Sequence, residues 1–201
     1  MAHERVGGSL AADVDGDDQE DEVYLVLDED AAAGCRSFLV AVTPAGTYAT
    51  PTHESGVEYG LPVPRLNAAV PVDERPGAEI VVDLEQGAAT QFLGLFTFLD
   101  GALVRVEARR APELTGGLLP YGGSVGHVEA TDCASGGDAD VVVSVATPLR
   151  DRYEVRRRFY DVAGSALVAL PELEERHQVA IDELESFPEY TAAPFGNCET
   201  A

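Results

Sequence analysis

Lysine is absent from this sequence of 201 residues, so all 13 of its Lys and Arg cations are arginines. They face 36 aspartates and glutamates, and the formal net charge is −23. A protein of this charge repels nucleic acids and anionic membranes but attracts cations, so we expect no nucleic acid partner. The same composition is typical of a cytosolic interaction protein adapted to high salt, and that alternative stays open.

Long apolar runs are absent as well. No segment approaches the roughly 18 consecutive apolar residues of a membrane-spanning helix. The amino-terminal stretch "MAHERVGGSL" contains no apolar core of the kind that signal peptides have. The protein is therefore cytosolic, or it is exported by a leader that this sequence does not include.

Cysteine is scarce: the three residues Cys35, Cys133 and Cys198 have spacings that match no zinc-binding pattern. They allow one disulfide and leave one free thiol. We favour a bridge between Cys133 and Cys198, because it would tie the carboxyl-terminal tail to the last part of the fold and contribute roughly 2 to 5 kcal/mol. The other pairings remain open.

The sequence does contain internal repetition. An acidic residue followed by a short apolar run occurs three times, as "EVYLV" from Glu22, "EIVVD" from Glu79 and "DVVVS" from Asp140. After each run come a second apolar segment, a turn and a third apolar segment. The turn Asp100-Gly101, between two apolar runs, is a strong hairpin signal. Such self-similarity predicts a repeat architecture.

These repeats predict an all-β fold. Each unit offers three or four short strands rich in Val, Leu, Phe, Tyr and Thr, and such a unit must stack on its neighbours to bury both faces. We expect one domain of tandem, blade-like antiparallel repeats resembling a β-propeller. The three units span approximately residues 8–60, 61–118 and 119–201. Helix is scarce, and the segment 171–187 is compatible with either a helix or a strand.

An acidic loop, "DVDGDDQED" at residues 13–21, precedes the first unit's apolar run. Calcium prefers six to eight oxygen ligands, and alternating carboxylates with a backbone carbonyl between them supply such oxygens. The candidate ligands are Asp13, Asp15, Asp17, the carbonyl of Gln19, and Asp21. The loop is not an EF-hand, because Tyr24 stands where the distal Glu would be. A solvated acidic turn is the alternative.

The loop and the strand expected after it resemble the FG-GAP or VCBS-type repeat of integrin-like β-propellers and of many secreted bacterial proteins. In that family a D-x-D-G-D-G-x-x-D-type loop binds calcium at the edge of a blade. The resemblance implies that the same five ligands bind calcium here. Asp18 stands where the family usually has glycine, and the FG and GAP dipeptides are not in place. The likeness is specific over this loop and architectural over the rest of the chain.

The later units depart from the loop pattern. At the corresponding positions the second unit presents Val70, Val72, Glu74, Pro76 and Ala78. This set predicts no metal. The third unit reads "TDCASGGDAD", with Asp132 and Asp138 out of register, and we expect no metal there either. Three units are fewer than a usual propeller contains, so a fourth is unrecognisable or the domain closes in a compact way of its own.

One motif points to an enzyme. In "YGGSVGH", Ser124 lies in the G-x-S-x-G spacing of a hydrolase nucleophile elbow, which works because a strand turns sharply into a helix. Here a strand is expected to follow, so we favour a glycine-rich turn, with a serine hydrolase that uses Ser124 as the alternative. The four histidines are scattered and show no metal spacing: His3, His53, His127 and His177.

The densest cationic stretch consists of Arg156, Arg157 and Arg158 in a predicted strand. Strand alternation would place Arg156 and Arg158 on one face and Arg157 on the other. We expect these side chains to pair with carboxylates on neighbouring strands. A binding patch for an acidic ligand is the alternative.

Together these features favour a non-enzymatic module of all-β repeats that calcium stabilises at one loop. We expect a binding or cell-envelope role in a secreted or lipoprotein-like protein, because such a loop fills only where calcium is plentiful. The partner is an unidentified protein or carbohydrate, and the oligomeric state is left open.

Overall fold

The structure is a computed structural model that describes residues 4–28, 31, 36–52, 64–111, 113–114, 117–124 and 126–198. Over these residues the chain is all-β, as the sequence predicts, and its short 3-10 helices lie in the carboxyl-terminal part. Nowhere in these ranges is there a helix both long and apolar enough to cross a membrane. Cys35, His3 and His53 lie outside the described residues.

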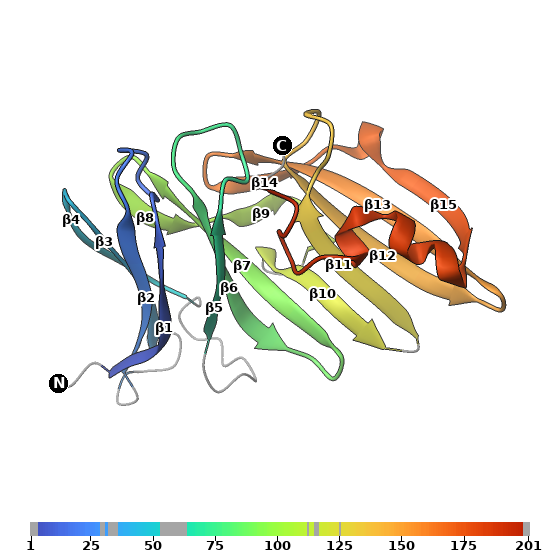
Figure 1. Cartoon of the computed structure of the whole chain (residues 1–201), viewed down its shortest axis with the longest axis horizontal. Helices are drawn as coiled ribbons and strands as arrows, with labels where there is room; N and C mark the ends of the chain where they lie inside the picture. Colours follow the sequence, from blue (N-terminus) through green and yellow to red (C-terminus); the bar gives the residue numbers. More distant parts are fainter. Residues whose placement is uncertain are drawn as a thin grey trace.

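The amino-terminal part forms a four-stranded antiparallel sheet in the order β1-β2-β3-β4 (Figure 1). Its strands are β1 (Glu4–Ala12), β2 (Asp21–Leu27), β3 (Ser37–Thr43) and β4 (Gly46–Pro51). Alternation along β2 buries Val23 and Leu25, which pack with Leu39 and Ala41 of β3. One face of this small sheet is therefore apolar and requires a second layer.

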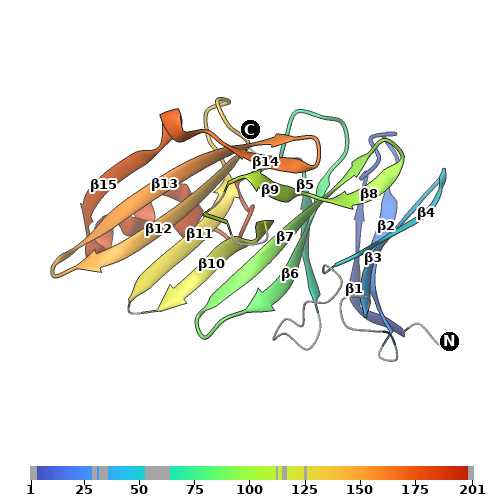
Figure 2. The ribbon, with the colours of Figure 1, turned by 180° about the vertical axis from the view of Figure 1, so that it is seen from behind.

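The rest of the described chain forms an eleven-stranded sheet in the order β5-β6-β7-β10-β11-β12-β13-β14-β9, with β8 on β7 and β15 on β13 (Figure 2). Its first strands are β5 (Arg65–Val70), β6 (Glu79–Gln86), β7 (Thr90–Leu99), β8 (Ala102–Arg105) and β9 (Glu107–Arg110). The others are β10 (Leu119–Ser124), β11 (His127–Cys133), β12 (Val141–Leu149), β13 (Arg152–Ala163), β14 (Ala166–Ala169) and β15 (Glu175–Ala180). All neighbours are antiparallel except β14 and β9.

Two long strands each share one edge between two partner strands. The first half of β7 pairs with β10 and its second half with β8. In the same way, the first half of β13 pairs with β15 and its second half with β14. The second meander (strands β5 to β9) and the third meander (strands β10 to β15) are thereby joined into one continuous sheet. The described strands close neither into a barrel nor into a propeller ring.

The core lies on both faces of β6 and β7. On β6, Ile80 and Val82 pack in the cluster shared with the amino-terminal sheet, whereas Val81 packs in the cluster shared with β12 and β13. This division follows from the two-residue period of a strand. The three consecutive residues "IVV" at 80–82 are all apolar because both faces of β6 are covered.

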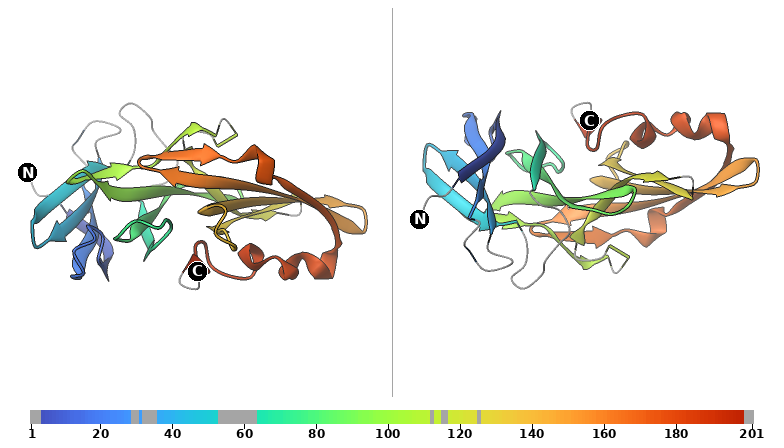
Figure 3. Two further views of the ribbon diagram at one scale, coloured as in Figure 1. Left: turned by 90° about the horizontal axis from the view of Figure 1, so that it is seen from above. Right: turned by 90° about the horizontal axis from the view of Figure 1, so that it is seen from below.

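The segment 171–187, which the sequence left undecided, contains a strand between two 3-10 helices. These are η2 (Pro171–Leu173), β15 and η3 (Ile181–Ser186), and η4 (Pro188–Tyr190) follows. The chain beyond β15 turns back and lies across one face of β10, β11 and β12, while the amino-terminal sheet stands at the far end of the molecule (Figures 1 and 3). This carboxyl-terminal segment therefore covers one face of the sheet.

Candidate functional site

The acidic loop between β1 and β2 brings three carboxylates together. Asp13, Asp15 and Asp21 each offer an oxygen, and these oxygens all lie within 4.8 Å of one another. Asp21 is the first residue of β2 and only 2% exposed, so its side chain points into the base of the loop. In the described ranges this is the one group of three or more potential metal-ligating side chains.

Backbone amides fix the shape of the loop. The carboxylate of Asp13 accepts hydrogen bonds from the N–H groups of Gly16 (2.7 Å), Asp17 (3.2 Å) and Asp18 (2.8 Å). Asp21 closes the loop by accepting from the N–H of Val14 at 2.9 Å. Asp18 has a φ of 64°, so it adopts the left-handed conformation that glycine usually takes at this position of the resembling loops.

Among the described residues, no cationic side chain balances the negative charge of the loop. One oxygen of Asp15 and one of Asp21, both Oδ1, are buried and have no hydrogen-bond partner among the described residues. Burial raises the pKa of Asp21, and the negative charges of Asp15 and Asp17 raise it further. No described arginine or histidine forms an ion pair with the three carboxylates. Converging oxygens without a counter-charge fit a hard divalent cation.

One of the four predicted carboxylate ligands stands apart from this group. The carboxylate of Asp17 accepts from the backbone N–H of Gln19 and from its side-chain amide, both at 2.9 Å. Asp17 is thus occupied in a local turn, and the structure brings together Asp13, Asp15 and Asp21 only. Spacing along the chain did not distinguish the aspartates that converge from the aspartate that forms the turn, because all of them stand at alternate positions of the loop.

The second loop requires a correction of register. Glu79 accepts from the N–H of Val72 at 2.9 Å, as Asp21 accepts from Val14, and both pairs are seven residues apart. The counterpart of Glu79 is therefore Asp21 and not Glu22. Residues 71, 73, 75, 77 and 79 correspond to the acidic loop, and the predicted set Val70, Val72, Glu74, Pro76 and Ala78 is wrong by one residue. The prediction aligned the apolar runs of the first two units. The position of the second loop is instead set by the carboxylate that closes it, so that alignment placed the loop one residue away.

In this register the second loop carries its own cation. The guanidinium of Arg75 donates to Asp73 (Nε to Oδ2, 2.7 Å) and lies 3.5 Å from Oε1 of Glu79. Thr97 also donates to Glu79, at 3.1 Å. Burial raises the pKa of Glu79 and the guanidinium opposes that shift. Arg75 was not among the residues predicted from the sequence, although its place four residues before Glu79 could have marked it as a partner of that carboxylate.

The two loops pack against each other. The N–H of Ala78 donates to the carbonyl of Asp13 at 2.7 Å. A Cβ at Gly16, whose φ is +79°, would lie 2.8 Å from Cβ of Pro76, so only glycine fits this approach. The acidic loop is therefore held by a neighbouring loop that carries a cation of its own.

The third unit uses its acidic residues differently. Asp132 accepts from the backbone N–H groups of Cys133 (2.8 Å) and Asn197 (3.1 Å). Asp140 accepts from the N–H of Val162 at 2.7 Å. Burial raises the pKa of both carboxyl groups, and these hydrogen bonds oppose the rise. Both side chains hold backbone together, and Asp138 is exposed in the turn between them.

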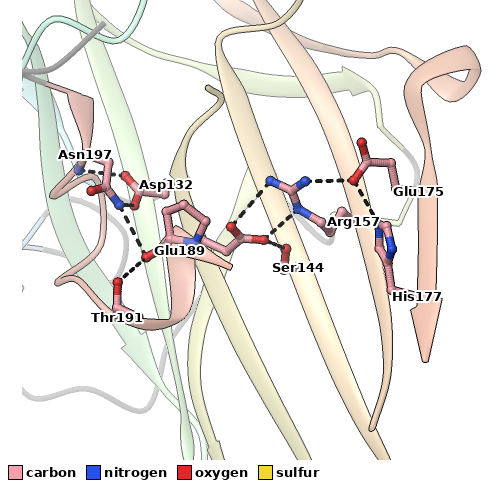
Figure 4. A network of polar contacts seen from close by, with 9 residues as sticks. Asp132, Ser144, Arg157, Glu175, His177, Glu189, Thr191 and Asn197 are labelled. Carbon is pink, nitrogen blue, oxygen red and sulfur yellow. Dashed lines mark hydrogen bonds and ion pairs between the residues drawn. The ribbon is translucent and has the colours of Figure 1, made fainter. Parts of the chain in front are cut away.

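A disulfide and a buried ion pair hold the carboxyl-terminal segment. Cys133 and Cys198 are bonded with an S–S distance of 2.03 Å, the pairing that the sequence favoured. Arg157 donates from Nε to Glu189 at 2.8 Å (Figure 4). The side chain of Glu189 is 1% exposed and also contacts Ser144. Glu189 is 32 residues from Arg157 in sequence, so no local signal marked this pair.

The motif around Ser124 forms a hairpin. Ser124 ends β10 and pairs with His127 at the start of β11, so a strand and not a helix follows it. The hydroxyl of Ser124 accepts from the N–H of Gly126 at 3.2 Å, while Nε2 of His127 lies 3.1 Å from Oγ1 of Thr90. The local geometry is that of the predicted glycine-rich turn.

The arginine stretch follows strand alternation as predicted. Arg156 and Arg158 both face Glu174, at 2.6 and 3.7 Å. Arg157 faces Glu175 and Glu189 instead, at 2.7 and 2.8 Å. The expected pairing with carboxylates is therefore found, but only Glu175 lies on a neighbouring strand, whereas Glu174 precedes β15 and Glu189 lies in η4.

In comparisons with known proteins, no protein-family model, curated protein or solved structure matched this chain.

Proposed function

We propose that this chain is a non-enzymatic β-sheet module in which calcium stabilises the loop between β1 and β2. Asp13, Asp15 and Asp21 would hold the ion, and the loop would be of the FG-GAP or VCBS type, with the three meanders acting as blade-like units. The module would serve a binding or cell-envelope role outside the cytosol.

The contrast between the first two loops carries this proposal. Both loops are closed by a buried carboxylate, Asp21 in one and Glu79 in the other. The second places the guanidinium of Arg75 beside that carboxylate, whereas in the first two buried oxygens have no partner among the described residues. Burying an unpaired carboxylate is unfavourable, so the first loop requires positive charge from solution.

The ligand chemistry favours calcium. The group contains carboxylate oxygens only, which suits hard cations and not zinc or copper. A bound ion would supply charge neutralisation and would link the end of β1 to the start of β2. Because the second loop packs on the first, the ion would also stiffen this edge of the molecule.

Two observations support export. A structural disulfide such as Cys133–Cys198 is typical of oxidising compartments. A calcium loop with few ligands is occupied at the high calcium concentrations found outside cells. With a net charge of −23, the partner would be a protein or a carbohydrate and not a nucleic acid.

Thermal unfolding with and without calcium tests the proposal. We compare the unaltered protein with Asp15→Ala and with the control Asp138→Ala, which removes an exposed aspartate from the third unit's turn. At saturating calcium the unaltered protein and the control should melt about 5 to 10 °C higher than in chelator. Asp15→Ala should gain little, and magnesium should act weakly.

Two outcomes would contradict it. Equal melting of Asp15→Ala and the unaltered protein in calcium would reduce the loop to an acidic turn. Stabilisation by any salt at high ionic strength, without preference for calcium, would instead favour the cytosolic protein adapted to high salt.

A further inference from the structure

A second candidate site lies beside β13, remote in sequence from the acidic loop. It is a cavity of about 360 Å³, within the size range of small-molecule pockets. Its lining residues are Glu113, Arg156, Arg158, Phe159, Ala169, Leu170, Pro171 and Glu174. Two cations thus face one cavity in a protein with only 13 basic side chains.

Three guanidinium groups converge on one carboxylate at this cavity. Glu174 receives Arg156 at 2.6 Å, Arg176 at 2.9 Å and Arg158 at 3.7 Å. Hydrogen bonds from Arg156 and Arg176 lower the pKa of Glu174 to about 2. Glu174 therefore stays ionised and is shared by three guanidinium groups.

The arginines retain unused donors. A guanidinium carries five N–H donors, and those withdrawn from water normally find acceptors. Nε of Arg156 is buried and has no partner among the described residues. Arg158 is 26% exposed, and its 3.7 Å contact with Glu174 is longer than a hydrogen bond. Arg158 therefore keeps donors for an acceptor that the described chain does not supply.

The remaining walls define what kind of anion fits. Phe159, Leu170 and Pro171 are apolar, so they suit an apolar body attached to the anionic group. Glu113 also lines the cavity, where its Oε1 accepts from the hydroxyl of Tyr160 at 2.7 Å. This second carboxylate and the net charge of −23 oppose a multiply charged ligand.

We propose that this cavity binds a single carboxylate group carried on an apolar or aromatic body. Arg158 would bind the carboxylate through the planar pair of N–H groups that suits carboxylate geometry. Arg156 also lines the cavity and would add a second positive charge, while Leu170 and Pro171 would contact the apolar part. Glu174 acts as an internal competitor, because it occupies the guanidinium groups that the ligand requires.

Titration calorimetry on the full chain tests this site, with phenylacetate as the probe. Phenylacetamide, which has the same body without the charge, and inorganic phosphate are the comparison ligands. Phenylacetate should bind at one site, whereas phenylacetamide and phosphate should bind at least about tenfold more weakly. Phosphate binding as tightly as phenylacetate would overturn the carboxylate assignment.

Four variants locate the binding. Arg158→Gln should weaken phenylacetate binding by about tenfold or more, and Arg158→Lys should fall between it and the unaltered protein, since lysine keeps the charge but loses the planar pair of donors. Glu174→Gln should tighten binding by about threefold or more, because the competing carboxylate is gone. Arg150→Gln, in the exposed turn before β13, is the matched control and should change nothing.

Three results would overturn the proposal. These are the absence of any phenylacetate binding, equal effects of Arg158→Gln and Arg150→Gln, and weaker binding in Glu174→Gln. Circular dichroism of each variant shows whether it is folded. If Arg158→Gln does not fold, Arg158→Lys and Glu174→Gln still decide the question, because their expected effects have opposite signs.

Discussion

Arg75 is expected to act as the built-in cation of the second loop, and replacing it by glutamine tests this role. The guanidinium contacts Asp73 and Glu79, whose side chains are 6% and 3% exposed. It also donates to Oγ1 of Thr97 at 3.3 Å and to the carbonyl of Gly164 at 3.5 Å. Arg75→Gln would leave two nearly buried carboxylates facing each other without a counter-charge.

The magnitude follows from the exposure of the pair. Breaking a fully buried ion pair costs about 3 to 5 kcal/mol. The side chain of Arg75 is 34% exposed, so solvent screens part of its charge and we expect a loss of about 2 kcal/mol in the free energy of unfolding. Arg150→Gln, at an exposed turn, should cost less than about 0.5 kcal/mol.

The loss should depend on pH with a defined sign. Burial already raises the pKa of Glu79, and removal of Arg75 raises it further. Protonation of Glu79 in the folded state removes the unpaired charge, so the difference between Arg75→Gln and the unaltered protein is largest well above this pKa and shrinks as pH falls through it.

Urea denaturation at about pH 7.5 and about pH 5 measures both quantities. A loss no larger than that of Arg150→Gln, or a loss that is equal at the two pH values, would refute the role assigned to Arg75. The contrast between the first loop and the second loop would then no longer support a cation in the first.

Further predictions concern the carboxyl-terminal segment and the hydrolase alternative. Glu189→Gln breaks the pair with Arg157, in which the two side chains are 1% and 13% exposed, and should cost about 3 kcal/mol in urea denaturation, whereas the exposed Glu185→Gln should be nearly neutral. Cys198→Ser opens a link that spans 65 residues and should cost about 4 kcal/mol under oxidising conditions, with no difference from the unaltered protein once both are reduced. Ser124 should not react with a fluorophosphonate probe, because it lies in a hairpin and not in a strand-to-helix turn; labelling that Ser124→Ala abolishes would revive the hydrolase.

Local features of the sequence were sufficient to predict several strands, a hairpin and the acidic loop. The turn Asp100-Gly101 between two apolar runs predicts a hairpin, and β7 and β8 are found there. The acidic loop was recognisable for the same reason, since its candidate ligands lie within nine consecutive residues. Alternation also placed Arg157 on the face opposite its neighbours.

Relations between distant residues were not predictable in this way. The register of the second loop depends on the hydrogen bond from Val72 to Glu79, which the apolar run does not encode. The partner of Arg157 is Glu189, which only the turn after β15 brings close. The cavity beside β13 likewise depends on Glu113 and Glu174 meeting across separate elements.

The sequence by itself determined the all-β class, the acidic loop and the charge of the surface, because each is set by neighbours in the chain or by composition. The tertiary structure alone decided which carboxylates are balanced. Asp21 and Glu79 each accept from an N–H seven residues earlier in the chain, yet of these two carboxylates only Glu79 has a described guanidinium beside it. Whether a buried charge is compensated depends on what the fold places within a few ångströms, and the low dielectric of the interior makes that placement decisive.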